Sequence, residues 1–236
     1  MKISKLTLFA ALTGLLFPLS TVAQTLNTLT PKEAAEGWEL LFDGKSMEKW
    51  RCYKMDKVQG WAIEDGAMIA LGLPGRQGGD VITKEKYKDF ELYLEWKVAQ
   101  GSNSGIFFHV VEGEQYPTVY MTGPEYQLLD DVGAPDAAPV HRSGANYDVH
   151  PPRFGQVKTL DQWNTAKIVV KGARVEHWLN DRKVVEYEMW TPEWQELKNN
   201  SKWRDAEGYC KYPEGHIALQ DHGGVTSFRN IKIRKL

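Results

Sequence analysis

One stretch of the sequence decides the fold class. Residues 90–98 read Phe90-Glu91-Leu92-Tyr93-Leu94-Glu95-Trp96-Lys97-Val98, with a large apolar side chain at every second position and polar side chains at most of the others. Successive side chains of a β-strand point to opposite faces of a sheet, so this alternation predicts a long strand with one buried face. We therefore expect a sheet that packs one side against the core.

Strand patterns recur on both sides of this stretch, and helical patterns are sparse. Gly172-Ala173, Gly223-Gly224 and Asp65-Gly66 are turn signals between such strands. Helix starts are indicated only by Thr30 before Pro31 and by Thr191 before Pro192. Many strands with few helices predict an antiparallel β-sandwich or barrel. The other expected strands are residues 61–63, 67–71, 106–111, 163–171, 174–179, 183–189, 216–221 and 227–234.

The first residues have the pattern of a targeting segment. Lys2 and Lys5 precede an apolar run over 6–19, and the small residues Thr21-Val22-Ala23 follow it. The run is short for a membrane span, and the pattern is typical of a secretory signal peptide. We expect an exported protein, periplasmic or secreted. The predicted division is a signal peptide over 1–23, an N-terminal segment over 24–36 and one β-sandwich domain over 37–236.

The composition excludes some partners. The formal net charge is −2, so nothing indicates a basic surface for nucleic acid. No later stretch is apolar enough to span a membrane. The two cysteines, Cys52 and Cys210, can oxidise in an exported chain, but the sequence leaves open whether they are bonded. The chain has nine Trp, ten Tyr and eight Phe, and exposed aromatic faces are a means of binding sugars.

The most informative candidate site lies in the sequence Gly123-Pro124-Glu125-Tyr126-Gln127-Leu128-Leu129-Asp130. In a strand, Glu125 and Gln127 share one face with Leu129. A face that only packs against a core would carry Val, Ile or Phe at these positions. Glu125 can serve as an acid or base, and Gln127 as a hydrogen-bond donor to a hydroxyl or oxyanion. The alternative interpretation is a polar strand face in solvent.

Other candidates stand at strand ends and in a long loop. Gln220 and His222 share a face just before Gly223-Gly224, where a histidine is accessible and titrates near neutrality. Tyr147 could supply a hydroxyl donor and Asp148 a base or an orienting acid. For Asp130, a turn or capping role is an equal alternative. For His109, which lies in an apolar run, a buried structural role is the alternative.

Metal binding has only weak support in the sequence. The histidines are scattered, without a His-x-x-x-His pair and without paired cysteines. A site built from His109, Glu125 and His222 could form only through folding. We therefore predict no certain cofactor and regard a divalent metal ion as an open possibility.

Taken in order, several short motifs resemble the 3-keto-disaccharide hydrolase domain family over about residues 37–236. Each motif alone is weak, and their order makes the set fairly specific. The motifs are Leu41-Phe42-Asp43-Gly44 with Trp50, Asp65-Gly66, Gly79-Asp80-Val81-Ile82-Thr83, Asp89-Phe90-Glu91-Leu92, Asn103-Ser104-Gly105-Ile106, Glu125-Tyr126-Gln127 with Asp130, Gly144-Ala145-Asn146-Tyr147-Asp148, Trp163-Asn164, the run from Gly215 to Gly223, and Phe228-Arg229-Asn230-Ile231.

The resemblance implies a concanavalin-like jelly roll of two curved antiparallel sheets, with the site on the concave face. It also implies cleavage of glycosides already oxidised to a ketone at C3, either by 1,2-elimination or with net hydrolysis, and hence a 3-keto-glucoside or disaccharide as substrate. The segment 190–212 is longer than we expect for the family and could shape substrate choice. The expected catalytic residues are Glu125, His222, Tyr147 and Asp148, and the expected substrate-binding residues are Gln127, Asp130, His109, Asn103, Gln220 and Arg229.

Two other functions are compatible with a β-sandwich. An ordinary retaining glycosidase holds two carboxyl groups about 5 Å apart, commonly by acids at alternate strand positions. Here Gln127 and Leu129 stand where the second and third acids would be. A non-catalytic, lectin-like carbohydrate-binding module fits the fold equally well, because a fold does not fix a function. The titratable cluster argues against such a module. The sequence does not indicate the oligomeric state.

Overall fold

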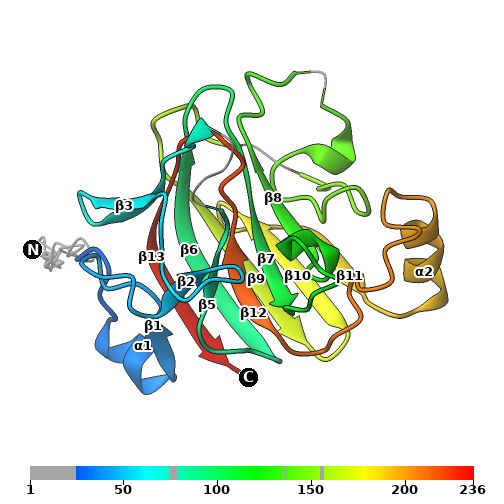
Figure 1. Cartoon of the computed structure of the whole chain (residues 1–236), viewed down its shortest axis with the longest axis horizontal. Helices are drawn as coiled ribbons and strands as arrows, with labels where there is room; N and C mark the ends of the chain where they lie inside the picture. Colours follow the sequence, from blue (N-terminus) through cyan, green and yellow to red (C-terminus); the bar gives the residue numbers. More distant parts are fainter. Residues whose placement is uncertain (1–24, 75–78, 136, 155–156) are drawn as a thin grey trace, which may run out of the picture.

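The computed structural model describes residues 25–74, 79–135, 137–154 and 157–236, which form two antiparallel β-sheets packed face to face (Figure 1). The expected all-β, jelly-roll type of sandwich with a few short helices is confirmed. The predicted signal peptide lies outside the described residues. No described helix is long and apolar enough to cross a membrane.

The larger sheet has eight strands in the order β11-β10-β9-β6-β13-β4-β3, with β1 paired to β13. Its centre is β6, in which burial alternates at every residue as the sequence predicts, so Phe90, Leu92, Leu94 and Trp96 face the core. The strands are β1 (Trp38–Leu40), β3 (Trp61–Glu64), β4 (Ala67–Ala70), β6 (Phe90–Val98), β9 (Asn164–Lys171), β10 (Arg174–Leu179), β11 (Arg182–Glu188) and β13 (Thr226–Lys235).

The smaller sheet has five strands in the order β2-β5-β12-β7-β8. These strands are β2 (Trp50–Cys52), β5 (Val81–Thr83), β7 (Asn103–Val110), β8 (Glu125–Leu129) and β12 (His216–Leu219). Most of their residues are buried on both faces. The inner face packs against the larger sheet, and the outer face is covered in part by η2 (Val119–Met121) and its neighbouring loops.

The core lies between the two sheets. Phe108, Tyr126 and Leu128 of the smaller sheet share one hydrophobic cluster with Phe90 and Trp96 of the larger sheet, and all five side chains are fully buried. A second, smaller cluster lies on the outer face of the smaller sheet and contains Ile82, Phe107, Val110, Val119 and Ala218. The two clusters identify which side chains of each strand face the core and which face outward.

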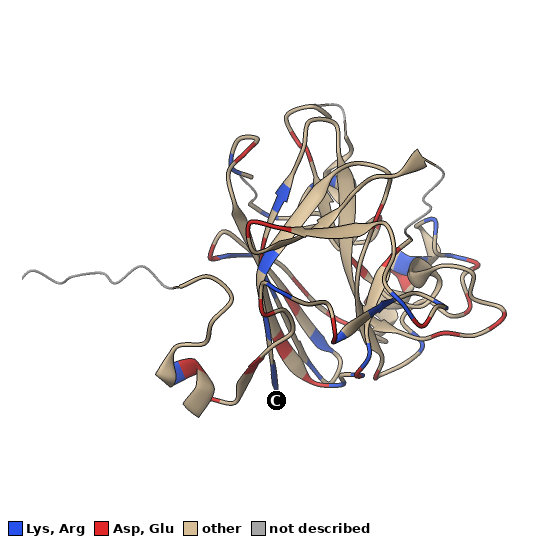
Figure 2. Cartoon of the chain, turned by 60° about the vertical axis from the view of Figure 1, so that its left-hand side comes forward, with Lys and Arg blue, Asp and Glu red and all other residues tan. Residues whose placement is uncertain are grey.

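Both predicted helices are present and begin at the expected caps. Thr30 and Glu33 form a capping box at the start of α1 (Pro31–Ala35), and Thr191 caps α2 (Pro192–Asn199). A short 3-10 helix, η3, spans Pro139–His141. Figure 1 shows α1 and α2 at opposite ends of the sandwich, and Figure 2 shows acidic and basic positions mixed along the chain.

The cysteine question that the sequence leaves open has an answer in the structure. Cys52 and Cys210 are both buried, and no disulfide joins them in the structure. Cys52 lies in β2, and the backbone oxygen of Cys210 accepts a hydrogen bond from Trp190 Nε1 at 2.7 Å.

Candidate functional site

The outer face of the five-stranded sheet carries two rows of side chains that cross it from edge to edge. Cross-strand register places Glu125 opposite Phe107, Phe107 opposite Ala218, and Ala218 opposite Ile82. In antiparallel sheets such opposed residues point to the same side. This first row is apolar except at its ends, because Arg51 pairs with Ile82 at the far edge.

The second row is polar. Gln127 stands opposite Gly105, and the backbone N–H of Gln220 donates to the Gly105 oxygen at 3.0 Å. Asp80 comes next, since its carboxylate accepts a hydrogen bond from the Asp221 backbone at 3.0 Å. A carboxylate, two amides and a bare glycine thus lie next to each other on one face of the sheet.

Glu125 is the buried carboxyl group of this face. Its side chain is 6% exposed and leans over Gly105, where an added Cβ would lie 2.4 Å from Glu125 Oε1. Burial raises the pKa of Glu125 to about 8, the nearby charge of Lys202 lowers it, and Asp80 raises it further. A carboxyl group with a pKa this near neutrality is suited to accept and return a proton.

Three amide side chains surround the bare Gly105. Gln127 Nε2 donates to Asn103 Oδ1 at 3.4 Å, which confirms that the structure brings these two predicted residues together. Gln127 and Gln220 are 1% and 4% exposed, and among the described residues neither Oε1 atom has a hydrogen-bond partner. A buried acceptor without a partner costs free energy. A ligand hydroxyl that donates a hydrogen bond to either oxygen would remove this cost.

Tyr147, His141 and Asp148 form one wall of the site. The backbone N–H of Tyr147 donates to the backbone oxygen of Glu125 at 3.0 Å, and this bond joins the loop to β8. The His141 ring stacks on Tyr147 at 4.5 Å, and its Nε2 lies 2.7 Å from Asp148 Oδ1. Burial first, and then the charges of Glu125 and Asp148, raises the pKa of the Tyr147 phenol. Tyr147 therefore stays a proton donor near neutral pH.

Lys202 completes this wall and was missed in the sequence. Its Nζ lies 4.0 Å from the centre of the Tyr147 ring and 4.3 Å from that of Trp203. Its backbone N–H donates to Asp148 Oδ2 at 2.7 Å. Trp203 in turn stacks on Tyr209 at 4.6 Å. The unusual length of the segment 190–212 was the one signal in the sequence that could have pointed to it.

Three predicted substrate-binding residues lie elsewhere, and their assignment to the site is corrected here. Arg229 is on β13 of the other sheet, where its Nε donates to Glu95 Oε2 at 2.7 Å while Phe228 beside it faces the core. The two Asp130 oxygens accept hydrogen bonds from the backbones of Gly101 and Gly133, so this carboxylate fixes turns. It points to the face opposite Glu125 because it stands an odd number of positions away.

His109 also lies outside the site. Its ring packs edge-on against Phe90 and Phe108 in the core, and its Nε2 contacts the Lys88 oxygen at 2.8 Å. Burial lowers its pKa. The structural role that was the alternative for this residue is the correct one. The metal site of His109, Glu125 and His222 is therefore not formed, because His109 points into the core.

His222 stays exposed at the edge of the site. It follows β12 by three residues, and its neighbour Gln220 lies beside Gly105. In the described parts of the chain, no three His, Cys, Asp or Glu side chains converge as metal ligands would. The donors nearest to one another on the face, Glu125, Gln127 and Gln220, offer one carboxylate and two amides. That set can bind hydroxyl groups, and it lacks the imidazole and thiolate ligands that suit zinc or copper.

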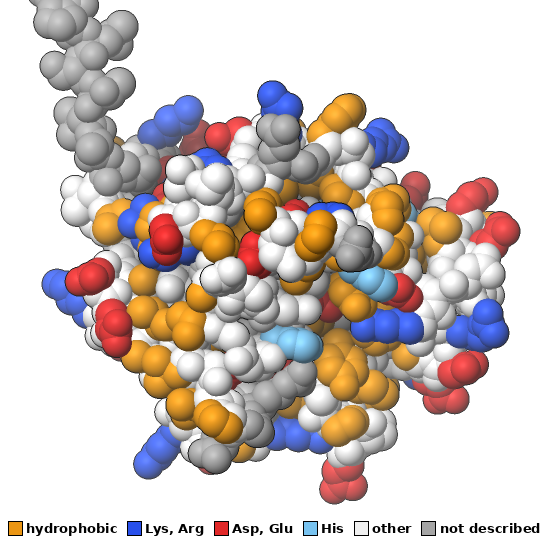
Figure 3. All heavy atoms as spheres, turned by 90° about the horizontal axis from the view of Figure 1, so that it is seen from above, with side chains coloured by type: hydrophobic (Ala, Val, Ile, Leu, Met, Phe, Trp, Pro, Cys, Tyr) orange, Lys and Arg blue, Asp and Glu red, His pale blue; other side chains and the backbone are white. Residues whose placement is uncertain are grey.

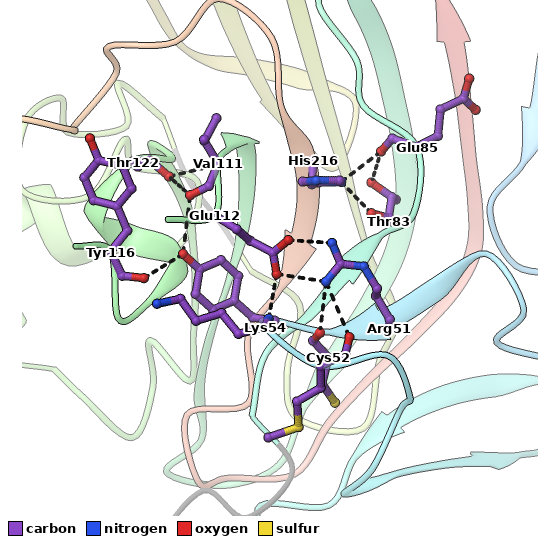
Figure 4. A network of polar contacts seen from close by, with 12 residues as sticks. Arg51, Cys52, Lys54, Thr83, Glu85, Val111, Glu112, Tyr116, Thr122 and His216 are labelled. Atoms are coloured by element: carbon purple, nitrogen blue, oxygen red, sulfur yellow. Dashed lines mark hydrogen bonds and ion pairs between the residues drawn. The ribbon is translucent and has the colours of Figure 1, made fainter. Parts of the chain in front are cut away.

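The far edge of the same sheet is tied by a separate polar network (Figure 4). Arg51 donates to the Glu112 carboxylate through both terminal guanidinium nitrogens, at 2.8 and 2.6 Å. The Tyr53 hydroxyl donates to the backbone oxygen of Tyr116 at 2.9 Å. His216 contacts the Thr83 oxygen at 2.7 Å. These groups are paired with each other, so the network fixes loops to β2. The chemistry concentrates at the β7–β8 end.

The surface does not suggest a polyanion-binding role. Figure 3 shows the end of the molecule that is uppermost in Figure 1. Basic and acidic side chains are mixed around its rim, and histidine side chains lie on it. An electrostatic footprint for nucleic acid needs one sign of charge over a continuous area. The face drawn has none.

Comparison with known proteins agrees with the fold. Residues 37–234 match the model of a family described as the 3-keto-alpha-glucoside-1,2-lyase-like domain. The chain belongs to this family. The resemblance seen in the sequence motifs is thereby confirmed, and so is the prediction of an enzyme.

Relatives of known sequence or structure cover most of the chain. A protein of Bacteroides thetaiotaomicron named 3-keto-disaccharide hydrolase is 36% identical over 92% of this chain and 84% of its own length. A solved structure from Parabacteroides distasonis, provisionally classed as a glycosyl hydrolase, superposes with a TM-score of 0.83 at 35% identity, over 90% of this chain and all of that one. A second structure from the same organism, classed the same way, gives 0.65 at 28% identity over 84% and 99%.

Proposed function

We propose that this family member cleaves glycosides whose sugar ring carries a ketone at C3, with Glu125 as the base that removes the proton from C2. The observation that carries the proposal is the burial of Glu125 over Gly105, which pairs with Gln127 and accepts a backbone hydrogen bond from Gln220. The name of the Bacteroides relative supports the substrate class. The 1,2-elimination step is our inference from chemistry.

A ketone at C3 changes how a glycosidic bond can break. It acidifies the C2 hydrogen, and it places the C1 oxygen β to the carbonyl. When a base takes the C2 proton, the C–H electron pair forms an enolate that spans C2, C3 and O3. The enolate then restores the carbonyl, forms a C1–C2 double bond and expels the C1 oxygen. Water that adds across this double bond, with OH at C1 and H at C2, gives net hydrolysis.

The described side chains can supply these steps. Glu125 accepts the C2 proton, since a pKa of about 8 makes it a stronger base than an ordinary carboxylate. Tyr147, held in its protonated form, can donate a proton to the leaving C1 oxygen. Asp148 orients His141 and the 200–204 loop rather than acting alone. Gln127 and Gln220 offer buried acceptors to ring hydroxyls.

His222 is the weaker candidate for the base. It is exposed, whereas Glu125 is nearly enclosed, and water excluded from a site strengthens the proton-transfer groups inside it. A lectin-like role is disfavoured because a binding module gains nothing from burying a carboxyl group, which costs folding free energy. The ordinary glycosidase is disfavoured because position 127 is an amide.

Product analysis tests the substrate class. The purified chain is incubated with 3-keto-glucosides of both anomers and with the unoxidised parent glucosides, and the products are followed by NMR. We expect aglycone release from a 3-keto-glucoside only, with either 3-keto-glucose or the C1–C2 unsaturated ketone as the second product. Release from an unoxidised glucoside would support the ordinary glycosidase. Binding without turnover of any 3-keto form would support the lectin-like module.

A further inference from the structure

Lys202 is held at the mouth of the site by contacts from two separate segments. Tyr147 and Trp203 flank its ammonium group at 4.0 and 4.3 Å, and its backbone is bound to the Asp148 carboxylate. Cation–π contacts of this kind favour the charged amine and restrict where it can go. The backbone of Tyr147 is hydrogen-bonded to the backbone of Glu125, so these contacts hold Lys202 in a fixed position relative to β8.

Lys202 and Glu125 are near each other without touching. Burial lowers the pKa of Lys202 and the charge of Glu125 raises it, while the charge of Lys202 lowers the pKa of Glu125. Among the described residues, however, no ion pair of 4.0 Å or less joins them. The two groups are therefore near each other with no ion pair between them, and the lysine side chain is exposed enough for a ligand to reach it.

The chemistry of the proposed reaction needs two groups in such a relation. The hydrogen on C2 and the oxygen on C3 belong to neighbouring carbon atoms of the sugar. A base that contacts the C2 hydrogen and a cation that contacts O3 are separated by roughly two hydrogen-bond lengths plus the sugar atoms between them. That separation is longer than an ion-pair distance. Negative charge develops on O3 as the C2 proton leaves, and a fixed cation there lowers the barrier.

We propose that Lys202 is the group that stabilises the enolate by donating a hydrogen bond to O3 while Glu125 takes the C2 proton. This inference rests on the proposed function. In the step, the C2–H bond breaks, its proton goes to Glu125, and its electron pair forms the C2–C3 double bond. The carbonyl pair moves onto O3, and Lys202 keeps its proton throughout.

Lysine variants test the assignment. Lys202→Met is compared with Lys202→Arg, and Lys211→Met, an exposed lysine of the same segment, is the matched control. We expect the methionine variant to lose about 10²–10³-fold in the rate of C2 proton removal, with a much smaller change in KM. Lys202→Arg should recover most of the loss, and the control should match the wild type. If Lys202→Met does not fold, as judged by its melting temperature, Lys202→Gln replaces it.

The pH profile is the readout that a merely structural role would not move. Removal of the Lys202 charge raises the pKa of Glu125, so the rising limb of kcat/KM should shift to higher pH in Lys202→Met and stay in place in Lys202→Arg. The other groups that act on Glu125 or respond to it are Asp80, Tyr147 and Tyr209, and they are unchanged in these variants.

The outcomes separate this inference from the proposed function. A wild-type protein that never removes the C2 proton of a 3-keto-glucoside overturns the proposed function. A wild-type protein that removes it, with Lys202→Met equally fast and with an unshifted pH profile, overturns the assignment of Lys202 and leaves the proposed function standing.

Discussion

At the scale of a single residue, Glu125 shows how the fold raises the pKa of a carboxyl group. A carboxylate with an ordinary pKa is a weak base, and a higher pKa makes it a stronger one. Burial over Gly105 destabilises the ionised form and so raises the pKa of Glu125 to about 8. Lys202 opposes this shift, which keeps the ionised form accessible. The sequence indicated the residue, but its burial became visible only when β7 and β8 were paired.

The first prediction concerns the pH dependence of the activity. Because Glu125 must be ionised to act as a base, kcat/KM should rise about tenfold per pH unit below pH 8 and level off above it. Glu125→Gln should lower kcat/KM by roughly 10²–10⁴-fold on the plateau above pH 8 and remove the rise with pH. The check is a pH–rate profile on a 3-keto-glucoside. Glu64→Gln, at the exposed end of β3, is the control and should leave the profile unchanged. A profile that is flat from pH 5 to 9 would contradict the assignment.

The second prediction is that the same substitution stabilises the protein at high pH. The pKa of Glu125 is higher in the folded state than the ordinary 4.5, so its contribution is fully present below pH 4.5 and is lost as pH rises through 8. Glutamine has no such loss. The free energy of unfolding of Glu125→Gln, from urea titrations, should exceed that of the wild type by a few kcal/mol at pH 8, at about 1.4 kcal/mol per unit, and match it near pH 4.5. Equal differences at both values would contradict the raised pKa.

At the scale of the elements, the β7–β8 pair places a carboxylate where a neighbouring side chain would normally stand. Gly105 provides the space, since a Cβ there would lie 2.4 Å from Glu125 Oε1 and 2.9 Å from Phe107 Cε2. The third prediction is that Gly105→Ala displaces Glu125 and lowers kcat by at least about 10²-fold, while the protein still folds. Activity and melting temperature are measured together. Gly113→Ala, which meets only the flexible Gln115 side chain, should have neither effect. Full activity in Gly105→Ala would contradict the claim that Gly105 provides the space for the Glu125 carboxyl group.

The elements also show what could be predicted from sequence. β6 and β10 have one solvent face and one core face, and period-two alternation located β6 from the sequence. β5 is buried on both faces and three residues long, and it has no alternation to detect. Arg229 follows Phe228 in a strand that was found, but the sequence could not indicate that this strand belongs to the other sheet.

At the scale of the whole molecule, the site joins segments that are far apart in the chain. The floor comes from β7, β8 and the end of β12, and the wall comes from residues 139–148 and from the loop after α2. Lys202 has no local pattern around it that differs from a solvated loop. Its proposed role arises from contacts with Tyr147 and Asp148, which only the folded chain provides. For this reason the sequence could indicate Glu125, Gln127 and Tyr147 as candidates but could not indicate Lys202.

The fourth prediction concerns acid stability. Burial lowers the pKa of His150 and of His177 to about 4, well below the ordinary 6.5. Between pH 6.5 and 4 the unfolded chain therefore binds more protons than the folded chain. The free energy of unfolding falls over this range as pH falls. His150→Gln should make the fall less steep by about 1.4 kcal/mol per pH unit. Chemical denaturation at half-unit pH steps checks this. A slope that stays the same in the variant would contradict the lowered pKa of His150.

Removal of hydrogen from C2 is the central event of the proposed reaction, and one isotope experiment tests it most directly. A 3-keto-glucoside deuterated at C2 is cleaved by the wild type, and the deuterium is followed by NMR. The account predicts a primary isotope effect on the rate, and loss of the label from C2 to solvent in the product that retains the ring. Cleavage at the same rate as the protonated substrate, with the deuterium still on C2, would contradict it.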